Sequence, residues 1–218
     1  MQFGRFGRVG QIVGWAGFLA AVAALSGCTT LATAMYIFKG TDVDAEFSGL
    51  RDKRVAVVCR PVANLEIRSQ NAARQIAQTL SQLLGQRVSR IEVIDQQEVA
   101  DWTDNNLWEE YVEVGQALNA DLVVGVDLER FSILEGQTIY RGKADVAVMV
   151  YDCHNGQRVY EKHLPQIVYP PNHVVSASEQ REAEFRRRFV RVVADQVGRL
   201  FYRHDRYADF ARDADALH

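Results

Sequence analysis

The chain has 218 residues, 48% of them hydrophobic, and its formal net charge at pH 7 is −3. This length suffices for a single domain that buries a sizeable hydrophobic core. The mildly acidic balance excludes the strongly basic composition typical of nucleic-acid-binding proteins, and we therefore expect no nucleic-acid partner.

The first 27 residues have the pattern of a secretory signal peptide. Arg5 and Arg8 are the only charged residues before Cys28, and residues 9–27 are almost all apolar or small. A basic start, an apolar stretch and small residues at its end are the three parts of a leader that is removed on export. The apolar stretch has 19 residues, which is also long enough to span a bilayer, so its length alone leaves an uncleaved anchor open.

The leader ends in Leu25-Ser26-Gly27-Cys28, which resembles the bacterial lipobox. The resemblance implies cleavage between Gly27 and Cys28, with a fatty-acylated Cys28 (palmitate among its acyl chains) as the new amino terminus. Several acyl chains would hold the protein firmly on a membrane, because each buried methylene contributes about 0.8 kcal/mol. Thr29 stands where enterobacterial lipoproteins of the inner membrane carry aspartate, which favours the periplasmic face of the outer membrane.

The remainder of the chain is expected to contain one domain. Residues 28–50 are predicted to be a tether behind the lipidated cysteine, residues 51–204 a single α/β domain, and residues 205–218 a polar tail. Removal of residues 1–27 would change the formal charge from −3 to −5, which still describes a mildly acidic domain.

The first half of the domain alternates strands and helices. The β-branched run RVAVVC (54–59) predicts a buried strand. Apolar residues on one helical face predict a helix over 70–84, which Gly85 is expected to end. Residues 90–95 predict a short strand. Apolar residues spaced by four, three and four predict a second helix over 107–118; they are Leu107, Tyr111, Val114 and Leu118.

The second half begins with two strands and a hairpin. Residues 120–128 predict a buried strand, and a slip in the apolar phase predicts a bulge near Glu129-Arg130. Residues 140–150 alternate between apolar and polar, which is typical of an antiparallel strand with one covered face. Asn155-Gly156 is the preferred sequence for a two-residue hairpin turn into the next strand.

The carboxy-terminal part is predicted to be a loop followed by a long helix. Residues 165–178 show no periodicity, and a loop of this length is often functional. The helix, over 179–204, has an apolar stripe flanked by arginines, among them Arg186, Arg187, Arg188 and Arg191. These arginines favour either a cationic surface for anionic lipid, lipopolysaccharide or an acidic partner, or an ordinary solvated flank whose side-chain stems cover the sheet edge.

The predicted order is βαβαβββα, an α/β (α+β-like) two-layer sandwich whose mixed sheet carries helices on one face. Five segments carry a resemblance to known proteins: KRVAVVCRPVAN, QIAQTLSQLL, IEVIDQQEV, NADLVVGVDLERFSI and VAVMVYDCHNGQRVYEK. In this order they resemble the amino-terminal domain of the translocation protein TolB and the curli-secretion and penicillin-binding-protein-activator lipoproteins. The resemblance covers residues 52–204 and implies the fold but no catalytic residues. The long inserts that build a pore in the curli-secretion family are missing, so channel formation is not implied.

The sequence contains no recognisable reaction centre. His154, His163 and His173 form no HExxH motif, and the chain has no CxxC pair that would bind zinc. Ser176 and Ser178 lie outside any GxSxG motif, and a helix-capping role explains them better. We therefore predict no catalytic residues, no metal, no cofactor and no small-molecule substrate.

Cys59 and Cys153 each end a predicted strand. An oxidising compartment would permit a disulfide between them, and burial as two separate apolar thiols is the alternative. The sequence leaves both open.

These observations predict a lipid-anchored, non-catalytic protein of the cell envelope that acts as a binding or adaptor domain in a protein complex. Its contact surface is expected to be an exposed sheet edge or the loop 165–178, through strand addition or loop docking. The alternative is a structural lipoprotein that binds the membrane surface or lipopolysaccharide through its arginine-rich carboxy-terminal helix.

Overall fold

The computed structural model describes residues 42–62, 67–136, 138–172, 175–176 and 182–205. The predicted leader, the cleavage site at Gly27 and the lipid-attachment residue Cys28 lie outside these ranges, as does the tail beyond residue 205. None of the helices in these ranges combines the length and the hydropathy needed to cross a bilayer.

A mixed sheet of seven strands organises the described chain, with its main strands in the order β3-β2-β4-β5-β6. Strand β2 (Arg54–Pro61) runs parallel to β3 (Glu92–Val93) on one side and to β4 (Leu122–Glu135) on the other. Strand β5 (Ile139–Asp152) is antiparallel to β4, and β6 (Arg158–His163) is antiparallel to β5. The sheet confirms the predicted α/β fold class.

One sequence signal in this sheet is confirmed, and a second is confirmed in part. The register of β4 against β5 shifts between Leu128 and Arg130, where the apolar phase slips. The β5–β6 connection contains Gly156, whose φ of 74° lies in the left-handed region that glycine adopts at low cost. The hairpin itself is as predicted, but its connection comprises residues 153–157, where the Asp152 carbonyl accepts a hydrogen bond from the Gly156 N–H, and is longer than the expected two-residue turn.

The predicted loop 165–178 contains two short strands. Strand β7 (Ile167–Tyr169) and strand β8 (Val175–Ser176) both pair with β5, beyond the part of β5 that β6 covers. Segments of two or three residues are too short for an alternating pattern to be visible, which is why the sequence predicted a loop here.

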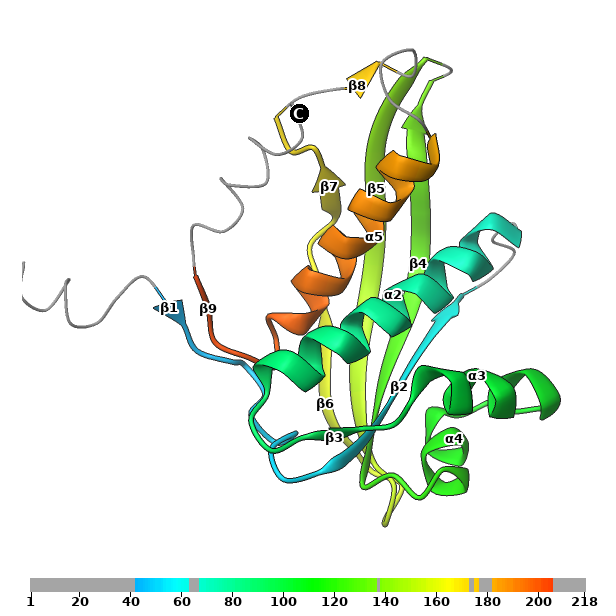
Figure 1. Cartoon of the computed structure of the whole chain (residues 1–218), viewed down its shortest axis with the longest axis vertical. Coiled ribbons are helices and arrows are strands. Elements are labelled where there is room, and N and C mark those ends of the chain that lie inside the picture. Colours follow the sequence, from blue (N-terminus) through cyan, green and yellow to red (C-terminus); the bar gives the residue numbers. More distant parts are fainter. Residues whose placement is uncertain (1–41, 63–66, 137, 173–174, 177–181, 206–218) are drawn as a thin grey trace, which may run out of the picture. The chain divides into compact units, whose positions relative to one another are not determined.

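Helices α2 (Ile67–Arg87) and α5 (Glu182–Gly198) lie side by side across one face of the sheet (Figure 1). They bury a large core against alternate residues of β2, β4 and β5, and Phe185 and Phe189 of α5 are fully buried in it. Leu50 is fully buried in the same core, and Phe47 packs against it. The compact unit therefore begins at Val43, before the predicted boundary at residue 51.

Two shorter helices cover part of the other face of the sheet, which differs from the expected arrangement with all helices on one face. Helix α3 (Gln96–Asn105) and helix α4 (Tyr111–Ala117) form a second apolar cluster with Ala56 and Val58 of β2 and with Val123 of β4. The physical reason is visible in β2 itself, because a continuous apolar run is typical of a strand buried on both faces.

The helix boundaries also differ from the prediction. Helix α2 continues past Gly85 to Arg87, because a glycine near a helix end lowers its stability without stopping it. Leu107 precedes α4 and is fully exposed, whereas Tyr111 and Val114 of that helix are buried as expected. The carboxy-terminal helix ends at Gly198, and β9 (His204–Asp205) then pairs with β1 (Asp42–Val43) in a two-stranded sheet.

Candidate binding groove

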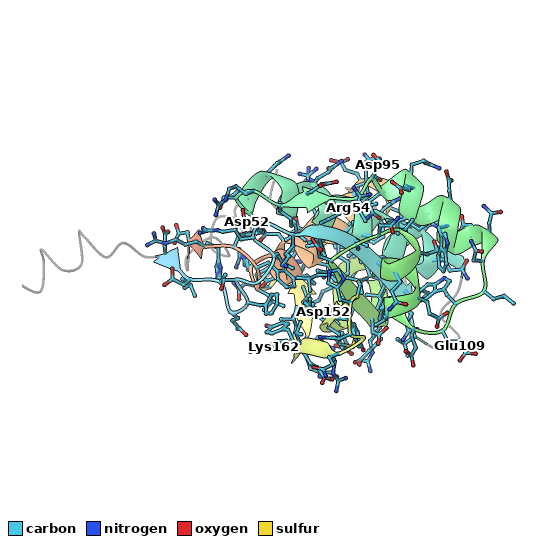
Figure 2. The ribbon with its side chains drawn as sticks, turned by 90° about the horizontal axis from the view of Figure 1, so that it is seen from below. Asp52, Arg54, Asp95, Glu109, Asp152 and Lys162 are labelled. Carbon is cyan, nitrogen blue, oxygen red and sulfur yellow. The ribbon has the colours of Figure 1, made fainter. Side chains whose placement is uncertain are left out.

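A groove of about 530 Å³ lies between α2 and α3, beside β2. Val57, Val58 and Cys59 of β2 line it, together with polar residues of the two helices. In Figure 2, Asp95 marks this side of the unit, and Lys162 of β6 lies at the opposite side. The groove therefore lies along one edge of the sheet.

The edge of β2 that faces the groove is mostly uncovered by strands. In the described ranges, β2 pairs with β3 only at Arg54 and Val55. The carbonyls of Lys53 and Val55 accept hydrogen bonds from this side, so odd-numbered residues of β2 direct their backbone polar groups toward it. Cys59 follows this alternation, and no described residue hydrogen-bonds to its backbone N–H or carbonyl.

Strand β3 is short because Asp95 begins a helix directly after it. Asp95 is the N-cap of α3, and its side chain accepts a 2.7 Å hydrogen bond from the backbone N–H of Gln97. The chain thereby leaves the sheet edge two residues after Val93. The side chain of Gln96 reaches back, and its Nε2 donates a 3.0 Å hydrogen bond to the carbonyl of Val57.

The wall formed by α3 is acidic. Asp95, Glu98, Asp101 and Asp104 occur at every third position, and α3 contains no lysine or arginine. Arg74 of α2 crosses to α3, where its guanidinium lies 2.7 Å from the Asp104 carboxylate. Among the described residues that line the groove, three are acidic (Asp95, Asp101 and Asp104) and Arg74 is the one base.

Ser81 of α2 also lines the groove. The residue is 7% exposed, and its hydroxyl has no hydrogen-bond partner within the described part of the chain. A buried hydroxyl without a partner is costly, and such a group needs an explanation in a native fold.

A second polar cluster, which no local sequence pattern indicates, joins α4 to the sheet. Asp127 Oδ1 on β4 accepts a 2.8 Å hydrogen bond from Arg60 Nε and a 2.7 Å hydrogen bond from the Tyr111 hydroxyl. The Arg60 guanidinium carbon lies 4.6 Å from the centre of the Tyr111 ring and 5.7 Å from that of Trp108. Burial, assisted by the charge of Asp127, raises the pKa of Tyr111 and keeps the phenol protonated. We interpret this cluster as a structural link that holds α4 against the sheet.

The arginines predicted to form a cationic surface lie on α5, the helix that covers the large core. Arg186 pairs with Glu182 and Arg188 pairs with Glu184, each one helical turn away. Arg187 and Arg191 are exposed to solvent. Intrahelical pairs thus neutralise two of the four charges, as expected for a solvated flank.

Cys59 and Cys153 are both free thiols, so the disulfide considered from the sequence is not formed. Cys59 packs against the core under α2 and α5, whereas Cys153 belongs to the cluster under α3 and α4. The two side chains therefore lie on opposite faces of the sheet. Burial raises the pKa of both thiols, that of Cys153 to about 11, which makes both poor nucleophiles.

Of the histidines and serines considered from the sequence, those that the structure describes lie in separate elements. His154 lies 3.2 Å from Asp121 in the turn after β5, and His163 of β6 lies 3.8 Å from Glu129. Ser176 is in β8, while His173 and Ser178 lie outside the described ranges. Where side chains are described, no group of three or more histidine, cysteine, aspartate or glutamate residues is arranged to hold a metal ion.

No protein-family model and no curated protein matches the sequence. Several solved structures, bacterial lipoproteins among them, are similar to it in fold. A PelC dodecamer from Paraburkholderia phytofirmans is 12% identical over 74% of this chain and 96% of that chain, with a TM-score of 0.41. Lipoprotein GNA1162 from Neisseria meningitidis is 10% identical over 66% of this chain and 96% of that chain, with a TM-score of 0.40. TolB from Acinetobacter baumannii is 13% identical over 72% of this chain, which spans 29% of TolB, with a TM-score of 0.33.

Proposed function

We propose that this chain is a lipid-anchored, non-catalytic protein of the cell envelope that binds a protein partner in the groove between α2 and α3. The observation that carries this proposal is the edge of β2, where the backbone of Cys59 has no described partner and lines an open groove. An uncovered sheet edge is the place where proteins accept an extended segment of another chain.

The anchor in this proposal is Cys28. The sequence Leu25-Ser26-Gly27-Cys28 provides the cleavage and acylation site, and the compact unit begins at Val43. A segment of about fourteen residues then separates the lipid from the domain, long enough to hold the domain near the membrane surface without burying it. Thr29 supports the periplasmic face of the outer membrane as the location.

The absence of catalysis in this proposal is supported by the state of the reactive groups. Asp127 is engaged by Arg60 and Tyr111 together, so its carboxylate is not available as a base. Cys153 is buried and Cys59 is half-buried, and both thiols have raised pKa values. These arrangements stabilise the fold and activate no nucleophile.

Membrane binding through the arginines of α5 has weaker support than protein binding in the groove. Arg186 and Arg188 are paired on their own helix, which leaves a smaller net charge facing solvent. Vesicles that contain anionic lipid test this alternative directly. Binding of the unlipidated chain that is lost when Arg187 and Arg191 become glutamate would favour it.

Crosslinking from defined positions in living cells tests the proposed binding role. A photoreactive residue at Gln82 on α2 or at Gln97 on α3 faces the groove, whereas the same residue at the exposed position Arg187 on α5 does not. We expect both groove positions to capture the same protein, identified by mass spectrometry, and position 187 to capture none of it. Equal capture from position 187, or no product from either groove position, would contradict the proposal.

Metabolic labelling tests the anchor separately. The wild-type chain is expected to incorporate labelled palmitate, to lose its leader and to fractionate with membranes. Cys28→Ser removes the only atom that can carry the thioether lipid, so labelling and leader cleavage should both be lost. A Cys28→Ser chain that matures and labels like wild type would exclude lipidation at this residue.

A further inference from the structure

We propose that the groove receives an extended segment rich in lysine or arginine, which adds to the outer edge of β2 as a further strand. This inference rests on the proposed function and names the chemistry of the partner segment. Three independent features of the groove support it: the direction of the β2 backbone, the charge of α3 and the buried hydroxyl of Ser81.

The backbone of β2 supports an added strand. Val57 and Cys59 direct their polar groups toward the groove, in the same direction as Lys53 and Val55, which pair with the β3 segment. An added strand would continue the line of β3 and would bond to the N–H and carbonyl of Cys59. Such backbone bonds provide affinity without requiring a particular side-chain sequence.

The charge of α3 selects a basic segment. Asp101 and Asp104 of α3 line the groove together with Asp95, the N-cap of that helix. Side chains on a strand alternate between its two sides, so every second residue of an added strand would point in the same direction. Lysine or arginine at alternate positions would then face the acidic row on α3, whereas glutamate at those positions would be repelled.

The buried hydroxyl of Ser81 also indicates a ligand, independently of the backbone of β2 and the charge of α3. The residue lines the groove, and its hydroxyl is buried and lacks a partner among the described residues. A hydroxyl can donate and accept one hydrogen bond or more, so a polar group of the incoming segment would satisfy it. The acidic row alone would be explained as a solvated helix face, and the buried hydroxyl is not explained in that way.

Two side chains occupy the positions that the segment would take. Gln96 donates to the Val57 carbonyl, as a backbone N–H of an added strand would, and Arg74 pairs with Asp104, as a basic side chain of the segment would. Binding must therefore displace both, and each competes with the segment. Removing either competitor is expected to strengthen binding, which is the opposite of what removing a direct contact does.

Fluorescence anisotropy with defined peptides tests this inference, using the full chain in detergent micelles. The probes are a labelled hexapeptide of alternating lysine and valine, a glutamate–valine counterpart, and a lysine–valine peptide whose backbone nitrogens are methylated. We expect the first peptide to bind and the second not to bind. Methylation keeps the charges and removes the backbone donors, so it should weaken binding by about tenfold or more.

Variants of the groove give effects of opposite sign. Asp101→Asn removes an attractive charge and should weaken the binding of the lysine–valine peptide by about threefold or more. Added salt should reduce this difference in affinity between the variant and the wild type. Gln96→Ala and Arg74→Gln remove competitors and should strengthen binding. Glu161→Gln, on β6 at the opposite edge of the sheet, is the matched control and should change nothing. Circular dichroism and thermal unfolding establish that each variant is folded.

Equal binding of the methylated peptide would overturn strand addition, and equal binding of the glutamate–valine peptide would overturn the basic segment. If no peptide binds while Gln82 and Gln97 still crosslink to one protein in cells, this inference fails and the proposed function stands. If the crosslinks are absent as well, both fail.

Discussion

The side-chain amide of Gln96 donates a 3.0 Å hydrogen bond to the backbone carbonyl of Val57. The bond substitutes for the next backbone bond that β3 would have made if it had continued along β2. Strand β3 stops because Asp95 caps α3, so a helix start determines how much of the β2 edge is left uncovered. The Asp95 cap thus contributes to leaving this side of the groove open.

Two glycines with different surroundings predict opposite effects of the same substitution. A Cβ at Gly125 would lie 2.6 Å from the Tyr111 ring, whereas one at Gly85 would meet only Val93 Cγ2, at 3.9 Å. Gly125→Ala should lower the free energy of unfolding by about 1–3 kcal/mol because the ring must move. Gly85→Ala should raise it by about 0.5–1 kcal/mol because alanine favours the helix. Urea unfolding of both variants measures the two effects, and equal signs would contradict the packing described here.

The hydroxyl of Tyr111 is predicted to stabilise the fold through Asp127. Tyr111→Phe keeps the ring and removes one of the two hydrogen bonds to the Asp127 carboxylate. Hydrogen bonds to charged groups contribute about 1.5–3 kcal/mol, so the free energy of unfolding should fall by an amount in this range. Tyr151→Phe in the same apolar cluster is the control, and its effect should be much smaller. Equal losses in the two variants would show that the Asp127 contact contributes nothing.

The two thiols of the domain should be free and protected. In a chain carrying Cys28→Ser, Cys59 and Cys153 are the cysteines that remain. Burial raises their pKa values, so neither should react with a disulfide reagent at pH 7.5 in the folded chain. Two thiols should react after unfolding without reductant. A count of zero would mean that they form a disulfide.

Acid should destabilise the fold partly through Asp121. The backbone N–H of Arg54 donates to its carboxylate, and His154 lies beside it, which lowers the pKa of Asp121 below its ordinary value. A carboxyl whose pKa is lower in the folded state adds stability above the pKa of the unfolded chain, about 3.9, and loses it as pH falls through the folded value.

Asp121→Asn should therefore flatten the loss of stability below about pH 4 while lowering stability at pH 7. Unfolding in urea at several pH values measures this. Asp101→Asn is the control, because its carboxylate accepts from a side-chain amide and not from a backbone N–H. If both variants keep the wild-type slope, Asp121 does not contribute to acid unfolding.

The strands of this domain were more predictable from sequence than the helices. The runs in β2 and β4 are continuously apolar, and this pattern indicates burial on both faces wherever it occurs. Burial on both faces requires helices on both, so these runs also indicate the helices α3 and α4 on the second face of the sheet. The sequence Asp95-Gln96-Gln97-Glu98 is an N-terminal capping pattern for α3, whereas the run 90–95 predicts a strand that includes Asp95.

The candidate site was less predictable, because its parts are distant in sequence. Arg60 and Asp127 are 67 residues apart, and the register of β2 against β4 places them together. The open edge at Cys59 depends on which residues of β3 pair and which do not, and no local pattern encodes that. An exposed sheet edge was expected as a contact surface, but the identity of the edge came from the topology.

Amide hydrogen exchange at Cys59 tests the open edge of β2 most directly. In the free chain, the Cys59 N–H should exchange much faster than that of Val58, whose backbone faces β4. Addition of the lysine–valine peptide should slow exchange at Cys59 by about tenfold or more and leave Val58 unchanged, because strand addition protects one side of β2 alone. Protection at Cys59 equal to that at Val58 in the free chain, or no change in it when the peptide is bound, would contradict the account.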